Sequence, residues 1–169
     1  MAGLNNEIEI LDIVDATDTV IGSATRDEVY EKLLPHRIVH VLIFNDKNEM
    51  ALQLRSNTVS FCPSHWSTAV GGHVQTGENY ESAAMREYEE ELGMKNTLTF
   101  FDKDIYEVED KPKKFLTIFT SRYNGPFSKD PTAVEKVEFF PLDTIRTMIR
   151  DGEKFHPELL FLLQKHFVN

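Results

Sequence analysis

Apolar and polar residues alternate over several short stretches of the chain, a pattern typical of half-buried strands. Residues 7–14 and 20–21, with a polar turn between them, predict an N-terminal hairpin. Residues 36–44 and 50–54 predict two more strands, again joined by a polar turn. Further strands are predicted at residues 67–70, 98–109, 115–123 and 137–140, the second and third of these forming a hairpin.

Helical spacing of apolar residues marks the remaining segments. Thr25 precedes two acidic residues and Pro35 ends the stretch, so a short helix is predicted over residues 25–34. Two more helices are predicted at residues 141–150 and 157–167. Apolar stripes are formed by Ala84, Tyr88 and Leu92 and by Leu159, Leu163 and Phe167. This order of elements predicts an α/β protein in which a mixed β-sheet is sandwiched by helices.

Composition favours one compact domain. With 169 residues, of which 41% are hydrophobic, the chain can bury one sizeable core and is expected to form a single domain. A net charge of −10 argues against unaided binding to a nucleic acid polymer or an acidic membrane. Cys62 is the only cysteine, no apolar run approaches ~18 residues, and the start of the chain lacks the features of a signal peptide. We therefore expect a cytoplasmic protein.

Acidic residues crowd the end of one predicted helix. Glu87, Glu90 and Glu91 are spaced so that a helix brings their carboxylates to one face, where they repel each other. They also precede Gly93, a residue type that commonly follows a helix end, and the helix dipole disfavours anions there by roughly 0.3 to 1 kcal/mol each. A divalent cation such as Mg²⁺, which takes oxygen ligands, would reverse both effects. The cluster is therefore a candidate metal site.

The residues around this cluster follow a recognisable spacing. Gly72, Gly77 and Glu78 are followed after seven residues by Arg86 and Glu87, then by two further glutamates, a glycine and an aliphatic residue. This segment, residues 72–94, resembles the Nudix box, and the chain is similar to the Nudix hydrolase family. The resemblance implies one Nudix domain over residues 1–169 with the α/β/α sandwich fold. Its parts are the N-terminal hairpin and short helix at 6–34, the box at 72–94 and the C-terminal helices at 141–168.

Family resemblance also implies roles for the box residues. Glu87, Glu90 and Glu91 would ligate Mg²⁺ or Mn²⁺ together with the backbone carbonyl of Gly72. Arg86 and Glu78 would orient these carboxylates. Tyr88 departs from the pattern, since an aliphatic residue usually stands there; we expect it to pack inward with a partner for its hydroxyl group.

The reaction implied is attack of water on one phosphorus of a diphosphate, with Glu90 or Glu91 accepting the proton. Glu138, in preference to Glu135, is the candidate for an additional acidic metal ligand from the last strand. Candidate substrate-binding residues are Arg55, which could hold a phosphate or be a surface charge, His73, which could touch a phosphate or bond to backbone, and Trp66, which could stack on a base or belong to the core.

Three segments of the sequence resemble one particular branch of the family. Residues 36–40, 52–55 and 66–73 resemble the branch that contains isopentenyl-diphosphate isomerases. Those enzymes place a catalytic cysteine where this chain has Gly71, and a pair of glutamates where it has the basic stretch 111–114. Because isomerisation needs acid and base groups, and glycine supplies neither, the sequence favours hydrolysis. Cys62 is expected to be a half-buried packing residue.

Several alternatives stay open at this stage. In the isomerases the histidines that match His36 and His73 bind a second metal, but the matching partner ligands are absent from this sequence. A nucleoside diphosphate or triphosphate, a nucleotide sugar and an isoprenoid diphosphate all fit as small-molecule substrates. A catalytically silent nucleotide sensor is the alternative from another class. The family resemblance is also compatible with a homodimer, in which the apolar C-terminal helix could serve core or interface.

Overall fold

The N-terminal segment forms a small unit of its own. The computed structural model describes residues 8–168, in which β1 (Ile10–Val14) and β2 (Val20–Thr25) pair antiparallel and lead into α1 (Arg26–Glu31). Thr25 caps α1 by accepting a hydrogen bond from the backbone N–H of Glu28. The predicted hairpin and helix are thus confirmed, although residues 6 and 7, where they were predicted to begin, lie outside the described residues.

The main sheet is mixed and has seven strands, in the order β5-β4-β3-β8-β7, with β6 also paired to β3 and β9 to β4. Only β3 and β8 run parallel, and the other pairs are antiparallel. The strands are β3 (His36–Phe44), β4 (Met50–Arg55), β5 (Trp66–Thr68), β6 (Val70–His73), β7 (Thr99–Tyr106), β8 (Lys114–Arg122) and β9 (Val134–Phe140).

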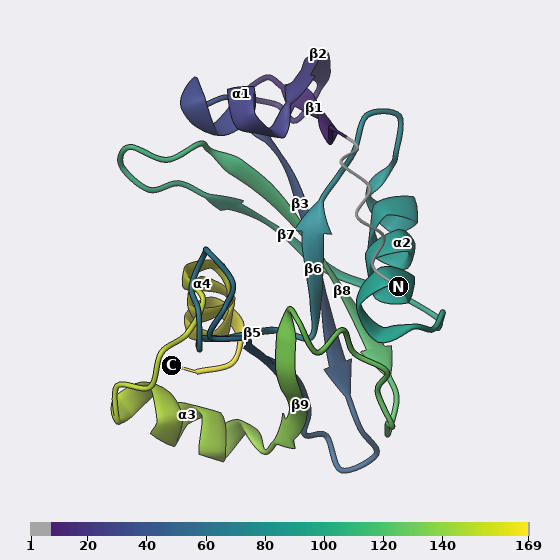
Figure 1. Ribbon diagram of the computed structural model, residues 1–169, viewed down its shortest axis with the longest axis vertical. Coiled ribbons are helices and arrows are strands. Elements are labelled where there is room, and N and C mark those ends of the chain that lie inside the picture. The colour runs from purple at the N-terminus through teal and green to yellow at the C-terminus, as the bar shows by residue number, and fades with distance from the viewer. Residues whose placement is uncertain (1–7, 169) are drawn as a thin grey trace.

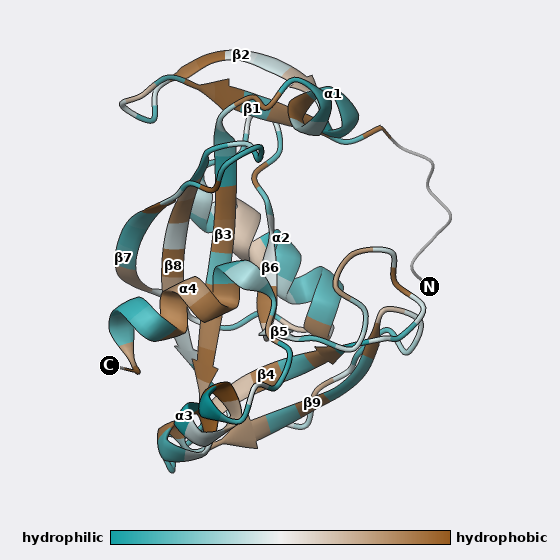
Figure 2. Ribbon diagram, turned by 90° about the vertical axis from the view of Figure 1, so that its left-hand side faces the viewer, coloured by the Kyte–Doolittle hydropathy of each residue, from teal (hydrophilic) through white to brown (hydrophobic). Residues whose placement is uncertain are grey.

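Helices cover the two faces of this sheet. Helix α2 (Tyr80–Leu92) lies beside β6 and β3, whereas α3 (Leu142–Arg150) and α4 (Pro157–His166) lie on the other side (Figure 1). In the side view, α4 lies in front of the apolar strand β3 and α2 behind it (Figure 2). The hairpin of β1 and β2, with α1, sits over one end of the sheet. The predicted α/β/α sandwich is therefore confirmed.

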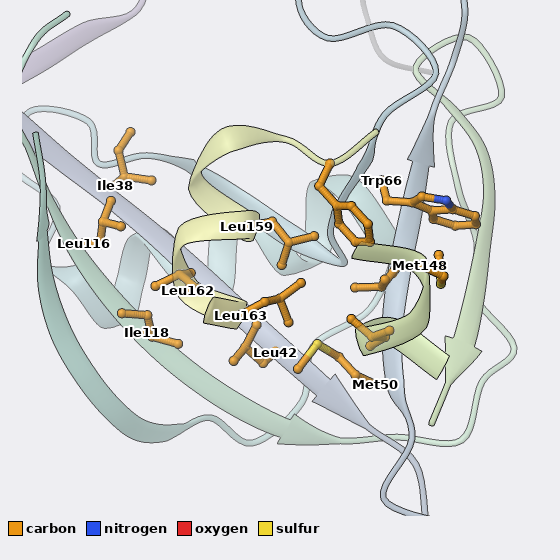
Figure 3. Packing of buried hydrophobic residues seen from close by; sticks show 13 residues of the cluster. Ile38, Leu42, Met50, Trp66, Leu116, Ile118, Met148, Leu159, Leu162 and Leu163 are labelled. Carbon is orange, nitrogen blue, oxygen red and sulfur yellow. The ribbon is translucent and has the colours of Figure 1, made fainter. Parts of the chain in front are cut away.

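Strand β3 explains why the core has two halves. Its residues alternate between the faces, so that Val39 and Val41 pack toward α2, while Ile38 and Leu42 pack toward α4. Leu159, Leu162 and Leu163 of α4 have no exposed surface and join the second group (Figure 3). The apolar stripe of the C-terminal helix therefore serves the core, which leaves the homodimer as an untested prediction.

One predicted strand divides into two. Residues 67–70 were expected to form a single strand, but β5 pairs with β4 while β6 pairs with β3. The change of partner occurs at Ala69, which is fully buried. Because strand pairing between distant segments decides this break, the local pattern could not predict it.

Helix α2 has well-defined ends. Asn79 accepts a hydrogen bond from the backbone N–H of Ser82, whose hydroxyl oxygen accepts one from the backbone N–H of Asn79. Gly93 ends the helix with a φ of 70°, which favours glycine. Tyr88 is fully buried and its hydroxyl group lies 3.3 Å from that of Ser121, as predicted. These contacts fix the rotation and position of the glutamates on this helix.

A compact ion-pair cluster ties the end of α4 to the edge strand β7. Asp104 bonds to the ring of His166 at 2.7 Å and to the ammonium group of Lys165. Burial alone would raise the pKa of Asp104, but the bonds from His166 and Lys165 lower it below its ordinary value. This cluster already has its own cations, and it lies apart from the box. No helix within residues 8–168 is long and apolar enough to cross a membrane.

We expect Tyr88→Ala to lower the free energy of unfolding by about 3–5 kcal/mol, because it removes a large side chain from the core. Tyr88→Phe should cost less than ~1.5 kcal/mol, since it loses only one hydrogen bond. Urea unfolding followed by circular dichroism measures both values. Equal costs for the two variants would contradict the assignment of Tyr88 to the core.

Candidate functional site

A cavity of about 1270 Å³ opens where β6, α2, α4 and α1 meet. It is large enough for a nucleotide-sized ligand, since ligand pockets usually measure ~300–1,000 Å³. Most of the predicted site residues line it, namely Gly72, His73, Arg55, Arg86, Glu87, Glu90 and Glu91. The structure thus gathers at one place residues that the sequence suggested separately.

Gly72 lies directly against the carboxyl group of Glu87. A Cβ atom at position 72 would fall 2.3 Å from Cδ and Oε1 of Glu87, a separation that real atoms do not adopt. Only glycine therefore permits the carboxyl group of Glu87 to lie where it does, directly against β6. The backbone at Gly72 and the carboxylate of Glu87 can consequently face one ligand.

Arg86 organises the acidic residues around it. Its guanidinium group donates to both carboxylate oxygens of Glu78, at 2.8 and 2.9 Å, and to the backbone carbonyl of His73 at 3.0 Å. The same side chain reaches Glu87 at 2.8 Å and Glu90 at 3.2 Å. Glu78 in turn accepts a hydrogen bond from the backbone N–H of Gln75. Arg86 and Glu78 therefore hold the loop and helix together, which suits an orienting role.

Glu87 and Glu91 are held in surroundings that disfavour their charge. Burial raises the pKa of Glu87 to about 7, although Arg86 opposes the shift. Burial, and then the charge of Glu87, raise the pKa of Glu91 well above its usual range, against a hydrogen bond of 2.9 Å from the backbone N–H of Gly71. Glu90 differs from both, because 59% of its side-chain surface is exposed.

These residues have the chemistry that a hard divalent cation requires. Carboxylate oxygens and a backbone carbonyl are its preferred ligands, and a cation would offset the cost of burying Glu87 and Glu91. Within residues 8–168, the group that brings three donor atoms within 4.8 Å of one another is Asp102, Asp104 and His166, which is already paired internally. The glutamates of α2 are spread more widely, with Arg86 between two of them.

His73 lines the cavity, and His36 lies buried beside it. Their rings stack at 5.5 Å, and the hydroxyl group of Tyr30 lies 2.7 Å from Nε2 of His73. Burial lowers the pKa of His36 to about 4 and of His73 to about 3, so both rings are neutral at pH 7. The ammonium group of Lys114 lies 5.3 Å from the centre of the Tyr30 ring. Among the described residues, no acidic group joins these histidines in a three-ligand cluster.

Glu138 does not belong with the box glutamates. Lys136, Glu138 and Phe140 share one face of β9, and Phe140 contacts Trp66 in the core half that includes α4. Glu138 pairs with Lys136 at 3.4 Å on that face, whereas α2 covers the opposite one. The prediction of Glu138 as a metal ligand is therefore wrong. Glu135 falls at an irregularity in the pairing of β9 with β4 and does not line the cavity either.

Trp66 is a core residue. Only 9% of its surface is exposed, its ring packs edge-on against Phe140 at 5.1 Å, and it does not line the cavity. Figure 3 shows it beside Met148 at the margin of the core. The prediction that Trp66 could stack on a substrate base is therefore wrong, because the indole is already covered on its apolar face.

Arg55 and its neighbours form the opposite rim. The guanidinium Nε of Arg55 donates to the backbone carbonyl of Phe61 at 3.0 Å, and both residues line the cavity. Phe61 is 55% exposed and contacts the ring of His156. Cys62 is half-buried, as expected, and burial raises the pKa of its thiol. Arg55 is therefore placed at the cavity, with other donors of its guanidinium group left to serve a ligand.

The sequence did not single out a second set of polar residues in the cavity. His40 lies between Thr68, 2.8 Å away, and Glu158, 3.0 Å away, and Glu158 also accepts a hydrogen bond of 2.8 Å from Lys114. Gln53 lines the same cavity. The alternation of β3 places His36 and His40 on one face, a signal that could have found His40; nothing local could have found Glu158, which lies 118 residues away.

Comparison with known proteins gives a consistent picture. The NUDIX domain family model matches residues 34–163. An uncharacterised Nudix hydrolase of Nostoc sp. is 32% identical over 96% of this chain and 98% of its own length. An isopentenyl-diphosphate Delta-isomerase of Photorhabdus laumondii is 31% identical over 73% of this chain and 70% of its own.

The fold is also known from solved structures. The crystal structure of the protein DR0079 from Deinococcus radiodurans matches with a TM-score of 0.79 and 24% identity, over 94% of this chain and 99% of that one. At this identity the likeness concerns the fold alone. With the family model spanning most of the chain and relatives above 30% identity, the chain belongs to the Nudix hydrolase family, whose members act on pyrophosphate bonds.

Proposed function

We propose that this protein is an Mg²⁺- or Mn²⁺-dependent pyrophosphohydrolase that cleaves a nucleoside diphosphate or a related organic pyrophosphate. The observation that carries this proposal is the contact between the Gly72 backbone and the carboxyl group of Glu87. It puts the backbone of Gly72 beside the box glutamate Glu87, in a cavity large enough for such a substrate. We also propose one Nudix domain over residues 1–169 and, on the single cysteine, a cytoplasmic location.

Each box residue would have a defined task. Glu87, Glu90, Glu91 and the carbonyl of Gly72 would hold the metal, which supplies charge neutralisation at the phosphate oxygens and a more acidic water. Glu91 is better placed than Glu90 to accept the proton of the attacking water. Its side chain is held by the backbone N–H of Gly71, whereas the side chain of Glu90 is 59% exposed. Arg86 and Glu78 keep the carboxylates oriented.

Isomerisation has less support, because the cavity offers no thiol at position 71. A side chain there would point at the ring of His40, whose Nδ1 would lie 3.4 Å from a Cβ atom. Glycine leaves that space open and can neither donate nor accept a proton. Cys62 is the cavity's only cysteine, and it lies at the rim with Phe61.

Gly72→Ala should weaken the binding of Mn²⁺ by about 10- to 100-fold, because the new methyl group displaces the carboxylate of Glu87. Calorimetric titration with Mn²⁺ measures the change. Gly71→Ala is the matched control, since its Cβ would meet its nearest neighbours at 3.4 Å, and it should keep the metal affinity within a few-fold. Equal affinities in the two variants would contradict the ligand set.

The raised pKa of Glu87 predicts a pH dependence of the metal-free protein. Ionised Glu87 opposes folding, so its contribution to stability is most favourable below pH 4.5 and is lost as the pH rises toward 7. Glu87→Gln should therefore gain about 2 kcal/mol relative to the wild type between pH 5 and pH 8. Urea unfolding in the presence of a chelator tests this. Glu89→Gln, at an exposed position of α2, is the control, and a constant difference for Glu87→Gln would refute the prediction.

Hydrolysis itself is tested with a panel of nucleoside diphosphates and triphosphates, nucleotide sugars and isoprenoid diphosphates at saturating Mg²⁺. We expect release of phosphate or pyrophosphate from at least one member. The double variant Glu90→Gln, Glu91→Gln should lose at least ~100-fold in rate, because metal stabilisation of the reaction is worth several kcal/mol. Glu89→Gln should retain the rate. Tight binding without turnover would indicate a sensor, and isomerised product without phosphate release an isomerase.

A further inference from the structure

The cavity has a second wall whose chemistry the hydrolytic step does not use. Across the backbone of Gly71 from Glu91 lies His40, which is joined by hydrogen bonds to Thr68, Glu158 and, through Glu158, to Lys114. Gln53 of β4 lines the same cavity, and these five residues are here named the polar wall. Since Gly71 carries no side chain, nothing at that position separates the polar wall from the metal-binding side. A ligand held by its phosphates near Glu87 could therefore extend to the polar wall.

The polar wall is buried to a degree that is unusual for polar groups. His40, Gln53 and Glu158 are each 5% exposed, and Thr68 is 2% exposed. Thr68, His40, Glu158 and Lys114 bond to one another in a chain. Burial opposes the charge of both Glu158 and Lys114. The contact with His40, and then that with Lys114, nevertheless lowers the pKa of Glu158, and the charge of Glu158 raises the pKa of Lys114. The chain thus presents fixed charges and dipoles to the cavity.

Gln53 is the member that the protein leaves unsatisfied. Its side-chain oxygen is buried and has no hydrogen-bond partner in the structure. A buried amide without a partner costs about 1–3 kcal/mol, and such groups are rare in folded proteins. Because Gln53 also lines the cavity, a ligand is the natural source of the missing bond.

Lys114 is set apart from its neighbour Lys113. Strands β3 and β8 pair in parallel, with Lys114 opposite His36, so that Lys114 shares the cavity-facing side of the sheet. Its side chain is only 12% exposed. Lys113 does not line the cavity, and its ammonium group lies over the ring of Phe115. Two adjacent lysines therefore provide one cavity residue and one matched control.

We propose that the polar wall binds the organic group of the substrate, and that Gln53 and Lys114 select a hydroxylated or heterocyclic group, as in a nucleoside or a sugar, against a hydrocarbon chain. This inference rests on the proposed function, which places the diphosphate at the box glutamates. An isoprenoid group has no polar atom to offer, so it would leave the side-chain oxygen of Gln53 unpaired and would bring hydrocarbon against the charge of Lys114. Sites built to bond a polar group can reject an analogue that lacks it by ~10⁴- to 10⁵-fold.

Binding is the first test, measured by calorimetry with Ca²⁺ in place of Mg²⁺ to suppress turnover. The probes are ADP, UDP-glucose, isopentenyl diphosphate and inorganic pyrophosphate. We expect ADP or UDP-glucose to bind at least ~10-fold more tightly than isopentenyl diphosphate. Equal or tighter binding of isopentenyl diphosphate would overturn the inference.

Variants then test the two residues. Lys114→Met should weaken binding of the preferred polar ligand by about 10- to 100-fold, and Gln53→Met by about 3- to 10-fold, with pyrophosphate affected little. Gln53→Met should also keep or raise the melting temperature, because it removes an unpaired buried group. A purely structural residue would show the reverse, a lower melting temperature and unchanged ligand preference. Lys113→Met should behave as the wild type.

Lys114→Met leaves the carboxylate of Glu158 without one partner and could unfold the protein. The double variant Lys114→Met, Glu158→Gln removes both charges and should lose the same ligand preference. Retention of the preference in Gln53→Met and in the double variant would overturn the inference.

Selective binding without turnover under Mg²⁺ would overturn only the proposed function, whereas turnover of isopentenyl diphosphate in preference to the polar substrates would overturn only this inference. Failure of all four probes to bind would overturn both.

Discussion

The approach of the Gly72 backbone to Glu87 is the contact on which the rest of the site depends. The carboxyl group of Glu87 can lie there only because position 72 has no Cβ atom, and the fully buried Ala83 and Ala84 present small side chains of α2 to the sheet. Capping at Asn79 and the left-handed Gly93 then fix where the helix begins and ends. The fold thus supplies a backbone carbonyl and a row of carboxylates as one rigid unit, before any ligand is bound.

Holding these carboxylates close together is electrostatically unfavourable, and the protein compensates their charges only in part. Arg86 compensates Glu78, Glu87 and Glu90, but Glu91 receives one backbone N–H and no cation. A structure selected for stability alone would not keep two carboxylates with raised pKa values beside a helix end. A divalent cation would compensate the remaining negative charge of these carboxylates. The repulsion between them in the metal-free protein would then favour metal binding.

Sequence reasoning succeeded where the determinants are local. The spacing of Glu87, Glu90 and Glu91 on one helix and the inward position of Tyr88 follow from helix geometry, and the strand and helix patterns gave the layers of the fold. It failed where strand register decides. Glu138 and Trp66 were assigned to the site, but the pairing of β9 with β4 turns Glu138 away from α2, and Phe140 covers Trp66. No local pattern encodes such contacts between distant strands.

The same distinction explains why the polar wall escaped notice although each of its residues is ordinary in isolation. From the sequence alone, Lys114 is interpreted as a charge on an edge strand. Glu158 is interpreted as an acidic residue in the first turn of a helix, where the helix dipole favours it. The parallel pairing of β3 with β8 and the packing of α4 over that pair bring these two residues together beside His40. In the proposed arrangement the metal ligands come from one contiguous segment, whereas the residues that would select the substrate come from four strands and a helix. Relatives can therefore share the box and still differ in the substrates they accept.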